Sequence, residues 1–115
     1  MENPAQSLSS KECVPCKSGG SPLPDNSIKE LLCRLNNGWM VQNGQLRKTY
    51  RFKNFAEALA FTNKVGELAE QQQHHPDISL SWGKVIIELY THKIKGLHEN
   101  DFILAAKVDA LDMSV

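Results

Sequence analysis

Apolar residues recur along the chain with two spacings, which together predict three helices and four strands. Spacings of three and four residues predict helices that begin near Ser27, Asn54 and His98. Short apolar or alternating runs predict strands at about residues 39–42, 45–52, 78–82 and 85–92. The order α-β-β-α-β-β-α predicts an α+β fold in which three helices pack on one face of a four-stranded antiparallel sheet.

Turn and cap residues mark the ends of these elements. Asn43-Gly44 is typical of a type I′ turn, so the first two strands should form a hairpin. Ser27 begins a Ser-x-x-Glu capping box for the first helix, and Asn54 should cap the second helix. Pro76 disfavours helical backbone in the residue before it, so the second helix should end one or two residues earlier.

The first 24 residues differ in composition from the rest of the chain. They are rich in Ser, Pro, Gly and Lys, and their few apolar residues show no periodicity. Such a segment cannot bury enough surface to offset the entropy that ordering costs. We therefore expect a flexible tail at residues 1–24 and a single domain at residues 25–115.

Cys13 and Cys16 form a CxxC motif within this tail. A structural zinc site usually needs a second such pair, and Cys33 supplies only one further thiol. A redox CxxC should open a helix beside a strand, which a tail does not provide. Reduced thiols are the simplest expectation, with transient metal capture or a disulfide under oxidation as alternatives.

The charges of the chain balance, with 13 Lys and Arg against 13 Asp and Glu. Binding to nucleic acid by bulk charge needs a basic surface, so the balance argues against it. No apolar run approaches the roughly 20 residues of a membrane span. The N-terminus also lacks the pattern of a secretory signal. We therefore expect a cytoplasmic protein that binds neither nucleic acid directly nor a membrane.

Candidate chemistry gathers near the end of the second helix. Glu70 and His74 are four residues apart, so on a helix they would share one face. His74 would also lie at the helix C-terminus, where the dipole favours a positive charge. Taken alone, His74 is more simply explained as a residue that complements the dipole at a helix end than as a catalytic residue. His92 at a strand end and Asp101 in the first turn of the last helix have equally simple structural explanations.

A metal site is the second interpretation of these histidines. His74, His75 and His92 could supply three imidazoles, as in some catalytic zinc centres. Adjacent histidines do not project to one point from a regular helix or strand, so His74 and His75 form a poor chelate. We therefore expect no bound metal.

The spacing of these residues resembles the pterin-4a-carbinolamine dehydratase family, also known as the dimerisation cofactor of a hepatic homeodomain transcription factor. The family pattern joins an acidic residue, His-His-Pro, an aromatic residue, a further His and an Asp. This chain matches it, in order, with Glu70, His74-His75-Pro76, Trp82, His92 and Asp101. Gly38-Trp39 is also similar, and the resemblance runs from about residue 25 to the end. His98 stands where the family often has Ser or Thr, so a weaker cap of the last helix is expected.

The resemblance implies dehydration of 4a-hydroxytetrahydrobiopterin to quinonoid dihydropterin and water, which recycles the pterin cofactor of aromatic amino acid hydroxylases. It also implies a homodimer or homotetramer that uses no metal and no organic cofactor. By position, it assigns acid/base catalysis to His74 and His92, orientation of these rings to Glu70 and Asp101, pterin binding to His75, and the shape of the pocket to Pro76 and Trp39. The alternative is a non-catalytic interaction module with the same fold, such as a transcriptional coactivator or an assembly factor.

Overall fold

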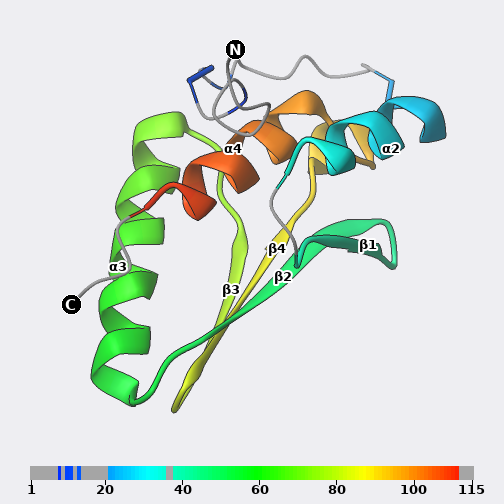
Figure 1. The fold of residues 1–115 in the computed structure, drawn as a ribbon. Helices are drawn as coiled ribbons and strands as arrows, with labels where there is room; N and C mark the ends of the chain where they lie inside the picture. Colours follow the sequence, from blue (N-terminus) through cyan, green and yellow to red (C-terminus); the bar gives the residue numbers. More distant parts are fainter. Residues whose placement is uncertain (1–7, 9, 12, 14–20, 36–37, 112–115) are drawn as a thin grey trace.

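Four antiparallel strands form one sheet, and helices cover one of its faces (Figure 1). The structure, a computed structural model, describes residues 8, 10, 11, 13, 21–35 and 38–111. Its elements are α2 (Asp25–Cys33), β1 (Met40–Gln42), β2 (Gln45–Arg51), α3 (Phe55–Gln72), β3 (Asp77–Ser81), β4 (Lys84–Leu89), the 3-10 turn η1 (His92–Ile94) and α4 (Glu99–Asp109). The predicted α+β fold and its element order are confirmed. None of the described helices is long and apolar enough to cross a membrane.

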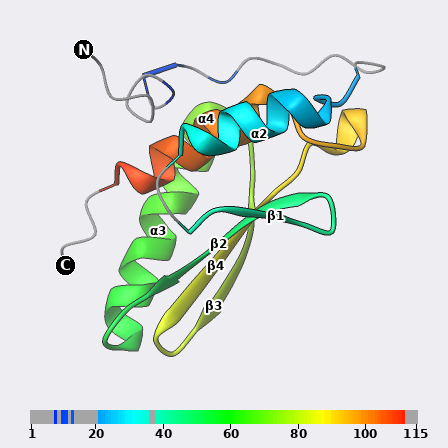
Figure 2. The ribbon, with the colours of Figure 1, turned by 45° about the vertical axis from the view of Figure 1, so that its right-hand side comes forward.

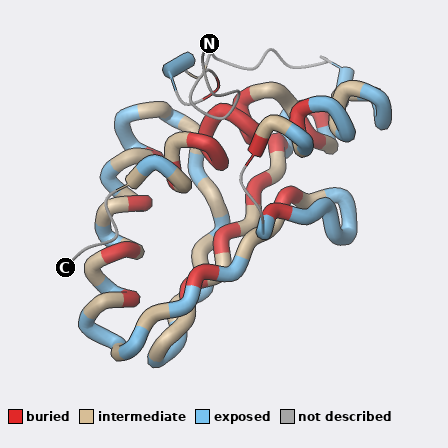
Figure 3. The backbone as a smooth tube through the Cα atoms, viewed as in Figure 1, coloured by how far each residue is buried: buried red, intermediate tan, exposed pale blue. Residues whose placement is uncertain are grey.

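The strands lie in the order β1-β2-β4-β3, so β2 and β4 form the middle of the sheet. Asn43 and Gly44 have φ angles of 53° and 74°, as the predicted type I′ turn between β1 and β2 requires. One face of β2 and β4 carries the buried residues Leu46, Tyr50, Val85, Ile87 and Leu89. The helices lie on one side of the sheet (Figure 2), and buried positions, red in Figure 3, line the space between the two layers.

The start of α3 agrees with the prediction, whereas the start of α2 does not. The Asn54 side chain accepts a hydrogen bond of 2.9 Å from the N–H three residues later, which confirms it as the N-cap of α3. The predicted capping box at Ser27 is wrong, because α2 already begins at Asp25. The Pro24 carbonyl accepts the Ile28 N–H, and an acidic residue in the first turn suits the positive end of the helix dipole.

β4 ends at Leu89, short of the predicted strand end at His92. Thr91 instead pairs with Gly96 through two backbone hydrogen bonds of 3.0 and 3.3 Å, and η1 fills the loop between them. Closing this tight loop takes the backbone out of the sheet ladder, and it brings Thr91 to the start of α4, where the Thr91 hydroxyl bonds Asp101.

The predicted tail, residues 1–24, is described only in part, so its flexibility stays a prediction. Within it, Leu8 is fully buried and belongs to the hydrophobic core. Burial of a single leucine is a tertiary contact that composition does not reveal. Cys16 lies outside the described residues, so the state of the CxxC motif also stays a prediction.

A buried carboxylate at the end of α4 fastens this helix to the sheet. The Asp109 side chain is only 4% exposed. One of its oxygens accepts the Trp39 indole N–H at 2.8 Å, and the other accepts the Lys48 ammonium at 2.8 Å and the Tyr50 hydroxyl at 2.5 Å. Burial and the neighbouring Asp109 raise the pKa of Tyr50 above its ordinary value, because both disfavour the phenolate.

Replacement of Tyr50 by phenylalanine should make the protein less sensitive to alkaline pH. Above the ordinary tyrosine pKa of about 10, the unfolded chain loses the Tyr50 proton while the folded chain keeps it, so stability falls as the pH rises. Tyr50→Phe removes this difference. Its free energy of unfolding, measured by urea denaturation, should therefore fall less than that of the wild type between about pH 9 and pH 11. Tyr90→Phe is the matched control, and an identical pH slope in the wild type and Tyr50→Phe would contradict the assignment.

Candidate active site

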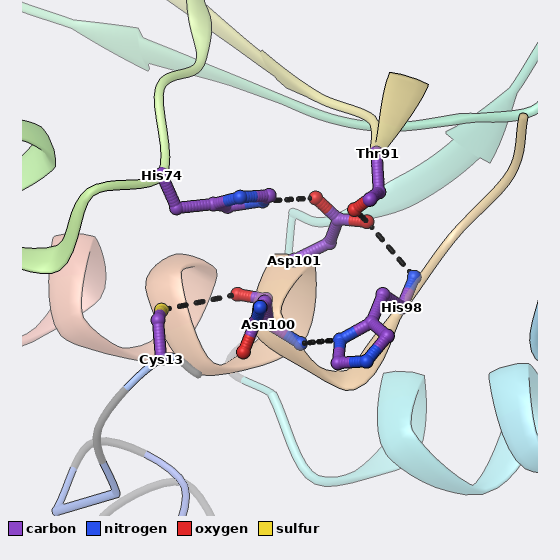
Figure 4. Close-up of polar contacts among 6 residues, drawn as sticks. All are labelled: Cys13, His74, Thr91, His98, Asn100 and Asp101. Carbon is purple, nitrogen blue, oxygen red and sulfur yellow. Dashed lines mark hydrogen bonds and ion pairs between the residues drawn. The ribbon is translucent and has the colours of Figure 1, made fainter. Parts of the chain in front are cut away.

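Asp101 is the centre of a group of polar residues at the start of α4 (Figure 4). Its side chain is fully buried. Oδ2 accepts the Thr91 hydroxyl at 2.9 Å and the His98 backbone N–H at 3.0 Å, while Oδ1 lies 2.6 Å from Nε2 of His74. The first turn of a helix favours a negative charge, so the position of Asp101 in α4 also compensates its burial. The carboxylate therefore starts the helix and holds an imidazole at the same time.

His98 caps α4 through both its ring and its backbone. Its Nδ1 accepts the Asn100 backbone N–H at 2.9 Å, and its own backbone N–H is accepted by Asp101. The two residues thus satisfy N–H groups that a helix start leaves without partners, in the manner of a capping box. An imidazole nitrogen that carries a lone pair accepts a hydrogen bond as a hydroxyl does, so His98 does cap α4, and its lower strength relative to Ser or Thr stays a prediction.

His74 and Glu70 do not pair, contrary to the expectation from their spacing. α3 ends at Gln72, and Gln73 has a left-handed backbone with φ of 54°. This turn removes His74 from the helical register, so its ring meets Asp101 and not Glu70. Nε2 of His75 pairs with Oε2 of Glu70 instead. The neighbouring histidines are therefore directed to different carboxylates, and they differ in exposure, with 13% for the His74 side chain and 58% for that of His75.

The contact with Asp101 decides which nitrogen of His74 is available for chemistry. An ionised carboxylate can only accept hydrogen bonds, so Nε2 of His74 carries the proton between the two groups. Nδ1 is then the ring nitrogen left to take or give a proton. A buried carboxylate behind an imidazole also stabilises the positive ring that forms when Nδ1 binds a proton. The pair is thus equipped for acid/base chemistry at Nδ1.

His92 is adjacent in sequence to the polar group around Asp101, but its ring takes no part in the hydrogen bonds described for that group. It begins η1 with an exposed side chain, and its ring packs edge-on against Tyr90 with the ring centroids 5.0 Å apart. It follows directly after Thr91, whose hydroxyl bonds Asp101. His92 is therefore close in sequence to the carboxylate, while its ring has a different neighbour.

Trp39 and Pro76 occupy different places relative to the pair. Pro76 is half-buried directly before β3 and follows the two histidines. Trp39 is buried at the other end of α4, where its indole bonds Asp109. From the rise of 1.5 Å per residue, Asp109 lies about 12 Å along the helix from Asp101. Trp39 is therefore remote from His74 in this structure.

Thr91 and His98 are site residues to which the sequence reasoning gave no role in the site. Thr91 sits where a regular strand was expected, and its contact with Asp101 depends on the loop to Gly96. His98 was detectable in principle, because His98 and Asp101 have the three-residue spacing of a capping box. The sequence therefore indicated His98 as a helix cap but not its link to the site through Asp101.

The metal interpretation gains no support from the geometry. Within the described part of the chain, no cluster of three or more His, Cys, Asp or Glu residues is arranged to hold a metal ion. His74 and His75 reach different carboxylates, so their rings do not converge on a common ligand. The arrangement suits proton transfer better than chelation.

Comparisons with known proteins agree with the sequence pattern. The model of the family described as pterin 4 alpha carbinolamine dehydratase matches residues 21–111. A protein of Rickettsia bellii (strain OSU 85-389), named as a candidate pterin-4-alpha-carbinolamine dehydratase, is 52% identical over 106 residues, which cover 91% of this chain and 94% of the relative.

Two solved structures are similar to the fold. A transcriptional coactivator/pterin dehydratase from Brucella melitensis has a TM-score of 0.73 and 28% identity, and the match covers 78% of this chain and 97% of the other. A pterin dehydratase-like protein identified as a RuBisCO assembly factor in the alpha-carboxysome has a TM-score of 0.57 and 28% identity, with 65% and 89% covered.

Replacement of Asp101 by alanine should destabilise the protein more than replacement by asparagine. Alanine leaves the Thr91, His98 and His74 donors without their acceptor, which should lower the free energy of unfolding by about 3 kcal/mol. Asparagine keeps an oxygen for Thr91 and His98 and turns its amide nitrogen to His74, whose Nε2 can accept once the ring proton moves to Nδ1, so its loss should be about half as large. Urea denaturation measures both. Equal losses in Asp101→Ala and Asp101→Asn would show that the acceptor does not matter.

Proposed function

Because the chain belongs to the pterin 4 alpha carbinolamine dehydratase family, we propose that it dehydrates 4a-hydroxytetrahydrobiopterin to quinonoid dihydropterin and water. The reaction would make it a hydro-lyase that recycles the pterin cofactor of aromatic amino acid hydroxylases. The observation that carries the proposal is the pairing of His74 with the buried Asp101 carboxylate. This pairing supports acid/base chemistry at the residue where the family pattern expects it.

The dehydration needs few catalytic groups. The carbon–oxygen bond at position 4a breaks as the lone pair of the neighbouring ring nitrogen forms a carbon–nitrogen double bond. One group must give a proton to the departing hydroxide, and another must take a proton from a ring N–H. In the proposal, Nδ1 of His74 performs one of these transfers, and Asp101 stabilises the protonated imidazole. No step needs a metal or an organic cofactor.

The other family positions receive supporting roles in the proposal. His92 would serve as the second acid/base group, since its side chain is exposed beside the loop that carries Thr91. His75 would bind the pterin ring, oriented by its contact with Glu70. Pro76 would shape the pocket directly. Trp39 is only 7% exposed, so it would act through packing and not through broad contact with the pterin.

A non-catalytic interaction module is the second candidate function. The observation that favours it is the similarity to the RuBisCO assembly factor, a pterin dehydratase-like protein by its description. Trp82, at 69% exposure, would be available to a partner of this kind. The intact His74–Asp101 pair favours the dehydratase, because a binding module has no physical need for it. A homodimer or homotetramer and a cytoplasmic location belong to either form of the proposal.

The purified protein should accelerate the dehydration of synthetic 4a-hydroxytetrahydropterin, with EDTA present throughout. His74→Ala should lower kcat by about a hundredfold, because proton transfer to or from a positioned side chain contributes 10²–10⁴-fold. His75→Ala is the matched control, since it removes an adjacent imidazole that pairs with Glu70. It should raise KM more than it lowers kcat.

Each outcome of this assay decides a different point. Turnover by the wild type no faster than buffer would reject the dehydratase and favour the interaction module. An active wild type with an equally active His74→Ala would reject the role of His74 alone. Loss of activity in EDTA that zinc restores would replace the proposed chemistry with a metal-dependent one.

A further inference from the structure

Three described residues of the predicted tail are held against the domain: Lys11 and Cys13 contact the elements that carry Asp101 and His74, and Leu8 is buried in the hydrophobic core. These residues, Leu8, Lys11 and Cys13, are called the N-terminal anchor below. We propose that the N-terminal anchor positions His74 against Asp101 by tying the end of α3 to the start of α4. The inference about geometry stands by itself, while its consequence for turnover rests on the proposed function.

Cys13 bridges the two helices directly. Its backbone N–H donates to the Gln72 side-chain oxygen at 2.9 Å, and its thiol donates to the Asn100 carbonyl at 3.8 Å. Gln72 is the last residue of α3 and Asn100 is the second residue of α4. Figure 4 shows Cys13 beside Asn100, next to the group that contains His74. The two attachment points therefore lie two residues before His74 and one residue before Asp101.

Leu8 and Lys11 attach the same segment at two further points. Leu8 is fully buried in the hydrophobic core, so it contributes apolar burial. The Lys11 ammonium lies 3.1 Å from the carboxylate of Glu99, the first residue of α4. Both side chains of this ion pair are more than 40% exposed, so the pair contributes little to stability. Burial of Leu8 is therefore the main stabilising contribution of the N-terminal anchor, and the hydrogen bonds of Cys13 set where the segment attaches to α3 and α4.

The two members of the catalytic pair do not depend equally on the N-terminal anchor. Asp101 is already fixed by Thr91, by His98 and by its place inside α4. His74 lies beyond the end of α3, after the left-handed Gln73. Its ring is hydrogen-bonded to Asp101. Loosening the end of α3 should therefore displace His74 and leave Asp101 in place. The anchor acts on the proposed chemistry through His74.

The test loosens the N-terminal anchor from each of its two ends in the full-length protein. Gln72→Met removes the acceptor for the Cys13 N–H but keeps a long side chain with good helix propensity. Leu8→Asp disfavours burial of the other end without altering Gln72. Gln71→Met, at an exposed position on the same turn of α3, is the matched control.

Two readouts separate positioning from stability. The first is the rate at which the His74 Nε2–H proton exchanges with water, followed by NMR, which should rise about tenfold in Gln72→Met and Leu8→Asp. The second is kcat for pterin dehydration, which should fall about tenfold with little change in KM, because misplacement by 1 Å can cost a hundredfold. Gln71→Met should match the wild type in both.

A purely structural anchor would give a different result. If both variants lower the urea midpoint while the exchange of the His74 proton and kcat stay at wild-type values, the positioning role is overturned. A wild type without dehydratase turnover would refute the proposed function alone, because the exchange rate still decides whether the N-terminal anchor holds His74.

Discussion

The structure depends on the burial of one carboxylate, that of Asp101. Burial of a charge costs several kcal/mol unless hydrogen bonds and opposite charge compensate it. Here three donors and the positive end of α4 supply the compensation. Thr91 and His98 satisfy one oxygen, and the other is left for an imidazole. The need to satisfy a buried acid therefore determines how His74 is oriented, and with it which ring nitrogen can meet a substrate.

α4 carries a second buried carboxylate at its other end, and the comparison of the two explains their different roles. Asp109 is bonded by Trp39, Lys48 and Tyr50, all from β2 or the approach to β1. Its partners are an ammonium, a phenol and an indole that the sheet holds in place, so this end fixes the helix. Asp101 faces a histidine that lies beyond the end of a helix. The contacts of Asp109 attach α4 to the sheet, whereas the pair of Asp101 and His74 can hold a proton.

Much of the fold was predictable because its signals are local. The Asn43-Gly44 turn and the Asn54 cap depend on neighbouring residues alone, and both were confirmed. The pairing of Glu70 with His75, and not with His74, was not predictable in this way. It requires a left-handed backbone at Gln73, which a residue other than glycine seldom adopts.

Two further features that the sequence did not predict, the position of Thr91 and the burial of Leu8, also result from tertiary contacts. Thr91 reaches Asp101 only after the loop to Gly96 closes, and Leu8 is buried although its surroundings in the sequence are polar. Composition and periodicity describe a segment by its own residues, so they cannot report what it packs against. The spacing of the histidines and acids indicated the family, whereas their pairing required the folded chain.

The most direct test of this account is the protonation of the two ring nitrogens of His74, read from ¹⁵N NMR chemical shifts of the neutral imidazole. The account predicts a proton on Nε2, held by Asp101, and an unprotonated Nδ1 whose signal moves when a pterin binds. A proton on Nδ1 with a free Nε2 would contradict it. That result would mean that Asp101 does not orient the ring and that another nitrogen meets the substrate.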